Sequence, residues 1–374
     1  MALVYFTDAR SRSSKESLLE KLGRLTEKAG LKDVVSHNDK VFIKPHMGAP
    51  LTTRYLRPIY VRKVVEQVRS IGADPVIVET TGLGLLDPRG TAEKHLKVAA
   101  SHGYTEDVIG APILIADGET GLDTLRVRGP KGDVCLAGAL REAGALISLA
   151  HFKGHIGVAF GGALKNVTIG LASKEGKFNF HFEDKPKVSE ELCNSCRECL
   201  AICPVKGAIK MVGDKAEIVP DLCVGCLACV MKCGPKAIVA KRSEPRELQL
   251  RMANMAGAVV NKVGKDRMLF VNFLLEVDWL CDCEHFQEGW SDVPIVPDRG
   301  IVASRDPVAL DMASMDLVNE APGVPGSKAE EVGAMAPGSD KFSAIYPKID
   351  WRRGLQACED LEVGTTEYKL VRVD

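Results

Sequence analysis

The sequence predicts an α/β protein: a mostly parallel sheet flanked by helices and interrupted by a small inserted α+β segment. Three observations carry this prediction. Short apolar, β-branched segments alternate with helical patterns before residue 190, and the same alternation resumes after residue 245. Between them lies a cysteine-rich stretch, about 187–242, that fits neither pattern. Strands that alternate with helices are typical of parallel sheets.

Four segments before the cysteine-rich stretch have the composition of buried strands. A helix is expected over residues 59–73, where apolar residues recur at helical spacing, and a short helix over 137–144. The expected strands are VFI at 41–43, PVIVE at 75–79, ILIAD at 113–117 and ALISLA at 145–150.

After the cysteine-rich stretch, residues 246–263 are predicted to be helical and 268–277 to form a buried strand. A last helix is predicted over 306–320, with Asp306 as its N-cap and Pro307 at its first position. Neither flank alone supplies a full set of strands. We therefore expect one discontinuous domain (1–186 plus 243–374) with 187–242 inserted, rather than two separate α/β domains.

The composition excludes several classes of protein. Lysine plus arginine total 49 and aspartate plus glutamate 50 among 374 residues, so the net charge of −1 favours neither nucleic acid nor an acidic membrane as a partner. No apolar run approaches the ~18 residues that a membrane-spanning helix needs. The first residues lack the order of a secretory signal, and we expect a cytoplasmic protein.

The cysteines give the most specific signal. Eight of the twelve fall between Cys193 and Cys233, in two runs spaced C-x2-C-x2-C-x3-C, the second 30 positions after the first. In such a run three thiolates hold one [4Fe–4S] cluster and the fourth ligates the other. The predicted ligand sets are Cys193, Cys196, Cys199 and Cys233 for one cluster, and Cys223, Cys226, Cys229 and Cys203 for the second.

These 55 or so residues resemble the bacterial two-cluster ferredoxin module. One departure is Gly234, which separates Cys233 from Pro235, whereas Pro204 directly follows Cys203. Two alternatives remain at this point. The eight cysteines could form two zinc sites, although zinc ribbons usually pair two C-x2-C knuckles across a longer gap. The clusters could also be structural, since bound metal contributes folding energy.

A further metal site is possible at Cys281, Cys283 and His285. In a strand their alternate spacing would place all three side chains on one face. The alternative is that these residues only pack there, because soft ligands without known geometry are weak evidence.

Polar side chains gather where the predicted strands end. Ligands of open α/β sheets bind beyond the carboxyl ends of the strands. We expect a pocket there for a phosphate or carboxylate, although the histidines could instead bind metal or move protons. Its residues of interest are Lys44, His151, Lys153, His155 and Lys165, with His46 beside them.

The chain also resembles the domain of unknown function family 362, which is described as uncharacterised iron–sulfur centre proteins. The resemblance rests on Lys44-Pro45, on the run from Lys153 to Asn166, and on SRDPVALD at 304–311. It implies an α/β domain with cluster binding and no established substrate. In the last motif Asp311 could be a pocket carboxylate or an exposed helix residue, and we favour the exposed position.

Two functions follow from these features. The first is an oxidoreductase that relays single electrons through two [4Fe–4S] clusters to a small anionic substrate or second cofactor in the pocket. The alternative is a non-enzymatic electron carrier, or a metal- or cluster-delivery protein, whose α/β domain docks redox partners. GLGLLD at 82–87 departs from the dinucleotide fingerprint and no Walker motif occurs, so neither NAD nor ATP is expected.

Overall fold

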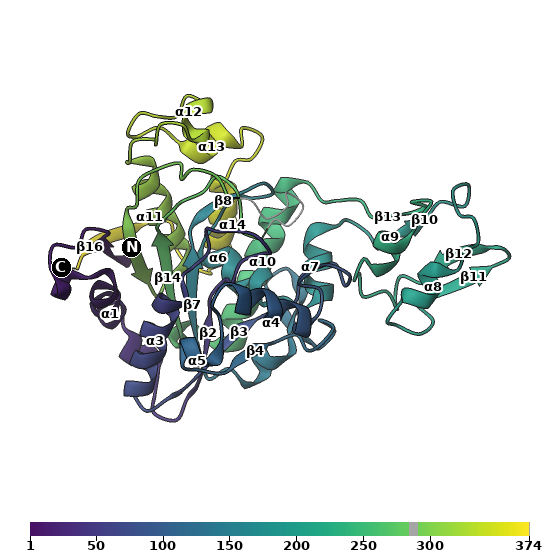
Figure 1. Cartoon of the computed structure of the whole chain (residues 1–374), viewed down its shortest axis with the longest axis horizontal. Helices are drawn as coiled ribbons and strands as arrows, with labels where there is room; N and C mark the ends of the chain where they lie inside the picture. Colours follow the sequence, from purple (N-terminus) through teal and green to yellow (C-terminus); the bar gives the residue numbers. More distant parts are fainter. Residues whose placement is uncertain (284–290, 374) are drawn as a thin grey trace.

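The computed structural model describes residues 1–283 and 291–373. Its centre is one eight-stranded sheet in the order β16-β1-β15-β14-β7-β2-β3-β4 (Figure 1). Among these strands β15 is antiparallel to both neighbours and the other pairs are parallel. The strands are β1 (Ala2–Asp8), β2 (Lys40–Lys44), β3 (Asp74–Glu79), β4 (Ile113–Ile115), β7 (Ala145–His151), β14 (Met268–Leu274), β15 (Gly300–Ser304) and β16 (Tyr368–Arg372).

The mostly parallel α/β fold predicted from the sequence is confirmed. β2, β3, β4, β7 and β14 lie where strands were expected, whereas β1, β15 and β16 were not foreseen. Strands from before residue 187 and from after residue 242 are hydrogen-bonded neighbours in this sheet. Residues 137–144 differ from expectation, because they contain a 3-10 helix (Gly138–Glu142) rather than an α-helix.

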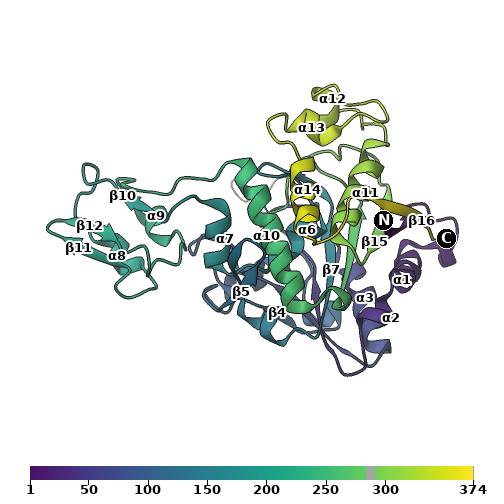
Figure 2. The same cartoon turned by 180° about the vertical axis from the view of Figure 1, so that it is seen from behind.

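Helices cover both faces of the sheet, and most of its strands contribute to both cores. In β14, Met268 and Phe270 pack into one core while Leu269 and Val271 pack into the other, as the period of two requires. One face carries α1 (Leu18–Lys28), α2 (Leu31–Val34), α3 (Pro58–Ser70), α4 (Ala92–Ser101) and α5 (Glu106–Ile109). The other, seen in Figure 2, carries α6 (Ala163–Val167), α7 (Lys174–His181), α10 (Pro245–Val263), α11 (Pro307–Asn319) and α14 (Arg352–Asp360).

Smaller elements complete the body. β5 (Thr124–Gly129) and β6 (Gly132–Ala137) form a hairpin against α10. The loop after α11 carries α12 (Lys328–Glu331) and α13 (Lys341–Ile345) at one end of the sheet (Figure 1). Among the described residues, no helix has the length and apolar character required to cross a membrane.

The two aspartates of the 304–311 motif have different roles. Asp306 is the N-cap of α11, as predicted, and its Oδ1 accepts hydrogen bonds from the backbone N–H groups of Val308 and Ala309. The expectation that Asp311 is exposed is wrong. Asp311 is fully buried and accepts hydrogen bonds from the first backbone N–H groups of α6, because α11 packs against that helix.

The cysteine-rich segment projects from the body as a lobe made of two similar halves (Figure 1). Its short strands pair in antiparallel fashion, β11 with β12 and β10 with β13. Its elements are β10 (Lys187–Val188), α8 (Glu198–Ile202), β11 (Ile209–Val212), β12 (Lys215–Ile218), α9 (Ala228–Lys232) and β13 (Ile238–Val239). A hydrogen bond of 2.9 Å from the Leu85 N–H to the Cys226 carbonyl ties the lobe to the body.

Candidate functional site

Three neighbouring parallel strands end in polar residues at the same edge of the sheet. β2 ends at Lys44, β3 at Glu79 and β7 at His151. The chain that follows β14 returns along this edge, where the carbonyl of Leu275 lies 2.9 Å from His151 Nε2. The sheet topology therefore brings residues 44–46, 79–82, 151–155 and 275–283 together.

A hairpin beyond β7 completes the edge. It consists of β8 (Lys153–His155) and β9 (Ala159–Gly161), and it leads into α6, which carries Lys165 and Asn166. The hairpin lies so close to the chain after β14 that a Cβ on Gly154 would be 1.8 Å from the carbonyl oxygen of Trp279. Glycine is needed there for protein packing rather than for a ligand.

All five pocket residues predicted from the sequence line one cavity of about 400 Å³. The structure thus brings together side chains that are up to 121 positions apart in the chain, from Lys44 to Lys165. The five are Lys44, His151, Lys153, His155 and Lys165.

Lys44 belongs to a buried ion pair. Its Nζ lies 2.7 Å from Glu79 Oε1 and also donates to Asn166 Oδ1 at 3.1 Å. Burial works against the charge of Glu79, but Lys44 and His46 outweigh it and hold the pKa of that carboxyl well below its usual range. Burial also lowers the pKa of Lys44. This lysine therefore neutralises Glu79 and is not available as an anchor for a ligand anion.

Asp282 forms the second buried charge cluster. Its Oδ1 lies 2.7 Å from Lys153 Nζ and 3.2 Å from His46 Nε2, and its Oδ2 lies 3.5 Å from His151 Nδ1. Burial opposes the charge of Asp282, but His46 and Lys153 hold its pKa well below the usual range. The ring of His46 lies between the two clusters, since its Nδ1 is 3.2 Å from Glu79 Oε2.

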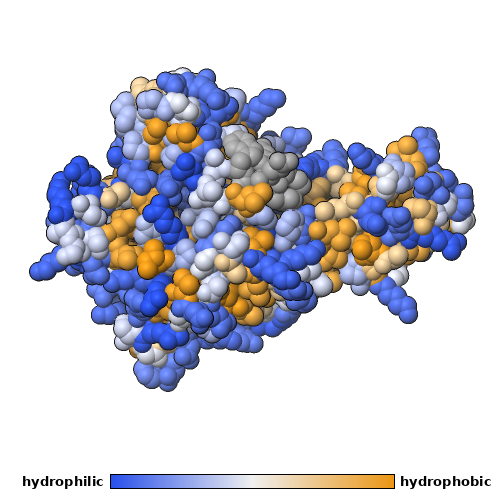
Figure 3. Space-filling view, viewed as in Figure 1, coloured by the Kyte–Doolittle hydropathy of each residue, from blue (hydrophilic) through white to orange (hydrophobic). Residues whose placement is uncertain are grey.

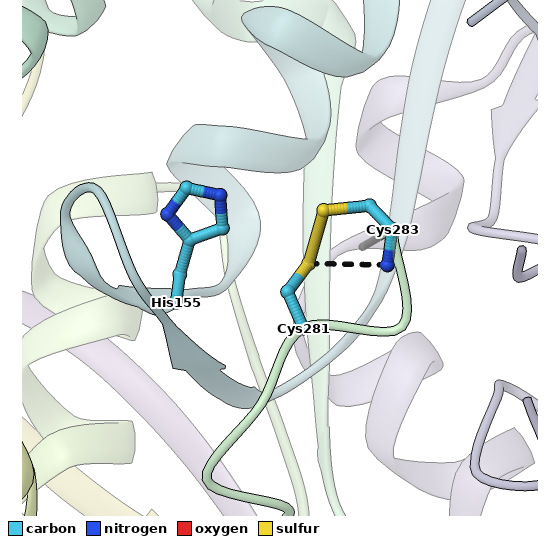
Figure 4. Close-up of side chains that lie close together, drawn as sticks. All are labelled: His155, Cys281 and Cys283. Atoms are coloured by element: carbon cyan, nitrogen blue, oxygen red, sulfur yellow. Dashed lines mark hydrogen bonds between the residues drawn. A yellow bond between two sulfur atoms is a disulfide. The ribbon is translucent and has the colours of Figure 1, made fainter. Parts of the chain in front are cut away.

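Lys165 lies beside two sulfur atoms. Its Nζ is 3.3 Å from the Sγ atoms of both Cys281 and Cys283, which form a disulfide. The ring of His155 faces this pair, with ligand atoms of the three residues within 4.8 Å of one another (Figure 4). Burial and the nearby Lys165 charge hold the pKa of His155 well below its usual range, so the ring is neutral near pH 7.

Only part of the metal site expected at Cys281, Cys283 and His285 falls within the described residues. His285 lies outside the described residues, and the histidine beside the two cysteines is His155. Sequence spacing could not have found it, because His155 and Cys281 meet only through the pairing of β7 with β14. The three described groups are close enough to share a metal ion when the disulfide is open.

A second pair of lysines comes from α7. Lys177 Nζ donates to Thr80 Oγ1 at 2.6 Å, and Lys174 Nζ donates to the Gly82 carbonyl at 2.5 Å. Burial lowers the pKa of each to about 8, although Asp117 acts in the opposite direction. Lys177 lines the cavity and is therefore a cation that can release a proton near neutral pH.

The sequence analysis left several of these residues out of the site. Asp282 stands between two cysteines and was not considered separately from them. Lys177 lies in α7, whose position relative to the sheet only the fold reveals. The signal available for Glu79 was its place at the end of a predicted strand.

The eight cysteines of the lobe divide into two groups, each around a small cavity. Four line one cavity together with Val188 and Ile238, and four line another together with Ile209 and Ile218. The first group is Cys193, Cys196, Cys199 and Cys233, and the second is Cys203, Cys223, Cys226 and Cys229. Each cavity thus takes its fourth cysteine from the other run.

The second cysteine group borders the large cavity at the sheet edge. Leu227, Val230 and Met231, which line that cavity, belong to the stretch that contains Cys226 and Cys229. Cys226 and Cys229 are buried, while Cys196 of the first group is exposed. Of the two groups, the second is therefore the one that adjoins the cavity.

Comparisons with known proteins place the chain in a family. The apoprotein of lactate racemase from Thermoanaerobacterium thermosaccharolyticum is similar in structure, with 11% sequence identity, a TM-score of 0.41, and coverage of 100% of this chain and 83% of that chain. No curated protein matches in sequence. The model of a domain of unknown function, DUF362, matches residues 41–316. This span covers the strand ends, the lobe, the 304–311 motif and most of α11, and the chain belongs to the DUF362 family.

Proposed function

We propose that residues 187–242 form an inserted domain that binds two [4Fe–4S] clusters. The observation that carries the proposal is the grouping of the cysteines around two cavities, four to each, with the fourth ligand exchanged between the runs. This exchange is the ligand pattern of two-cluster ferredoxins. Under this proposal, all eight cysteines of the lobe bind iron.

The backbone around both cavities fits such clusters. Ser195 and Arg197 have φ values of 64° and 61°, and their counterparts 30 positions later, Gly225 and Leu227, have 69° and 56°. Left-handed conformations at residues other than glycine are uncommon, and here they bend each loop around its cavity. The Ala237 N–H also donates to Cys233 Sγ at 3.2 Å, as expected for a sulfur that carries negative charge.

Zinc fits this arrangement less well. A zinc site of four thiolates brings them tightly around one ion, with each Zn–S bond about 2.3 Å long. Among the described residues, the groups of cysteine and histidine ligand atoms within 4.8 Å of one another do not include the lobe cysteines. Their wider spacing suits a larger inorganic group.

We further propose that the protein is an oxidoreductase in which electrons pass from the lobe to a ligand in the large cavity. Bound [4Fe–4S] clusters supply electrons one at a time. The support for this direction is that α9, which carries Cys229, forms part of the cavity wall. A bare electron carrier would not need the cavity of about 400 Å³ at the sheet edge.

The lysines that line the cavity have two different roles in this proposal. Lys44 and Lys153 neutralise Glu79 and Asp282, so they hold the site together rather than bind the ligand. Lys165 and Lys177 supply the positive charge toward a small anion. Lys177, with its pKa lowered to about 8 by burial, is the proton donor we expect for the reduced ligand.

A partner protein is the expected source of electrons. Several large apolar side chains of the lobe are exposed, and Figure 3 shows hydrophobic surface over the lobe and its junction with the body. Exposed apolar residues near the more accessible cysteine group suit a transient redox complex. These residues are Leu192, Val212, Leu222 and Val239.

The test begins with protein purified without oxygen. Wild-type protein should contain about eight iron and eight sulfide per chain, as two [4Fe–4S] clusters require. Cys199→Ser and Cys229→Ser should each lose about half of both, whereas Cys135→Ser, which changes a buried cysteine outside the lobe, should lose none. Zinc in place of iron, or full iron retention in both lobe variants, would contradict the cluster assignment.

A second measurement separates the oxidoreductase from a simple carrier. Lys177→Met should abolish turnover or ligand binding while the iron content and the rate of electron acceptance at the lobe stay unchanged. Changing two of the exposed apolar residues of the lobe together should slow electron acceptance at the lobe and leave ligand binding in the cavity unchanged. If Lys177→Met matches wild-type protein in every redox assay with the partner, the carrier function is correct.

A further inference from the structure

The large cavity also borders the disulfide between Cys281 and Cys283, which belongs neither to the ion pairs nor to the cluster ligands. Its two Cα atoms are 5.2 Å apart across a single intervening residue. Cys283 lines the cavity, whereas Cys281 is buried. A ligand in the cavity can therefore reach the sulfur of Cys283.

The surroundings of the two sulfur atoms stabilise negative charge on them. Lys165 Nζ donates to both at 3.3 Å, and the Cys283 N–H donates to Cys281 Sγ at 3.4 Å (Figure 4). A cation and an N–H donor beside a thiol favour the thiolate, which is the reactive form in thiol–disulfide chemistry.

The intervening residue fixes the position of the pair. Asp282 is buried and contacts Lys153, His46 and His151, three side chains from two separate segments of the sheet edge. The backbone of Cys281 and Cys283 is thus held in place whether the S–S bond is formed or broken. Such support from surrounding residues is what a site that changes state repeatedly requires.

The same features disfavour a permanent metal ion between the cysteines and His155. The ammonium group of Lys165 lies against both sulfur atoms, where it repels a second cation. Nδ1 of His155 accepts a hydrogen bond of 3.1 Å from the Gly157 N–H, so it is already engaged.

We infer that Cys281 and Cys283 are a redox-active pair that stores two electrons inside the cavity. The disulfide accepts two electrons and one proton from solvent water, its S–S bond breaks, and one thiol and one thiolate form, the thiolate held by the ammonium group of Lys165. Two reduced [4Fe–4S] clusters in the lobe supply one electron each and return to their oxidised state, and this choice of donor rests on the proposed function. The pair then converts single electrons into the electron pair that most small-molecule reductions need.

The lobe and the cysteine pair border the same cavity. The cavity that Cys283 lines is also lined by Leu227, Val230 and Met231, from the stretch that holds two cysteines of the second group.

The test follows the oxidation state of the two cysteines in the full-length protein. Oxygen-free protein is treated with two electron equivalents of photoreduced deazaflavin, quenched with iodoacetamide and analysed by peptide mass spectrometry. We expect Cys281 and Cys283 to resist alkylation beforehand and both to be alkylated afterwards. In Cys229→Ser the conversion should be at least tenfold slower, whereas Cys135→Ser should behave like wild-type protein.

Lys165→Met tests the role of the lysine without changing the cluster ligands. Iron content should be unchanged, and the equilibrium constant for reducing the pair in a dithiothreitol buffer should fall about tenfold, as expected for the loss of a charge-assisted hydrogen bond. Lys97→Met, at an exposed helix position, should leave this equilibrium unchanged.

Three outcomes would overturn the inference. In the first, the pair stays oxidised while the clusters are reduced, a result that leaves the proposed function intact. In the second, both thiols are free from the start and fail to form a disulfide when ferricyanide is added. In the third, native mass spectrometry finds a bound metal ion that is absent from Cys283→Ser. Absence of iron and sulfide from wild-type protein would instead refute the proposed function and, with it, the electron donor named here.

Discussion

Removing the carboxylate of Asp282 should destabilise the α/β part of the protein strongly. Asp282 and Lys153 have side chains that are 3% and 6% exposed, and their charged atoms are 2.7 Å apart. At this separation their mutual attraction is about 6 kcal/mol with an effective dielectric constant near 20. Asp282→Ala loses this attraction and leaves the charge of Lys153 buried without its partner.

The expected loss is about 3–5 kcal/mol of unfolding free energy, the usual cost of breaking a buried pair on one side. The double variant Asp282→Ala/Lys153→Met should recover much of it, because both buried charges are then gone. Glu93→Ala is the control. It breaks a pair whose side chains are 69% and 74% exposed, and it should cost less than about 1 kcal/mol.

Urea denaturation followed by tryptophan fluorescence measures these differences. All three tryptophans, at positions 279, 290 and 351, lie outside the lobe and report on the α/β part. The midpoint should move at an unchanged slope. The stability lost in Asp282→Ala should also become smaller in acid. Ion pairing lowers the pKa of Asp282 in the folded protein. Its contribution to stability is therefore fully present above the ordinary pKa of an aspartate and is lost as the pH falls through the lowered folded-state pKa. If Asp282→Ala costs no more than Glu93→Ala, or the double variant is worse than the single one, the buried-charge argument fails.

Three further predictions concern stability. Gly154→Ala should cost 1–3 kcal/mol or more, as overpacking usually does, because its Cβ would be 1.8 Å from the Trp279 carbonyl oxygen; Gly234→Ala, where a Cβ meets nothing within 4 Å, should change the midpoint little. Burial raises the pKa of Asp311 from 3.8 to about 6. The free energy of unfolding should therefore decrease as the pH rises from the ordinary pKa to the raised one, and Asp311 should cause no further decrease above that pH. Urea midpoints of Asp311→Asn should lack that decline; a parallel decline in both proteins would contradict the assignment. Asp306→Ala should cost about 0.5–2 kcal/mol by loss of the helix cap, and an unchanged midpoint would show that the cap contributes nothing.

The sequence predicted the central strands and the long helices because their signals are local. β14 is a continuous apolar run, and α11 begins at an Asp-Pro pair that both caps the helix and fixes its first turn. β1, β15 and β16 escaped prediction. β15 is a five-residue segment whose role depends on pairing with β1 and β14, which lie far from it in the chain.

Within the candidate site, the sequence could predict groups of residues that lie close together in the chain, whereas groups formed from distant segments required the tertiary structure. The two cysteine runs are repeats with fixed local spacing, so the sequence by itself determined their grouping, and the cavities in the lobe have the predicted members. The sequence also placed polar residues at strand ends.

Only the tertiary structure decided what those polar residues do. It paired Lys44 with Glu79 and Lys153 with Asp282, and it placed Lys165 beside Cys281 and Cys283. These contacts join segments that are more than 30 positions apart, and no local pattern encodes which charge meets which. Burial then fixes the outcome, because a charge removed from water must find a partner, and the packing of the strands determines which partner is within reach.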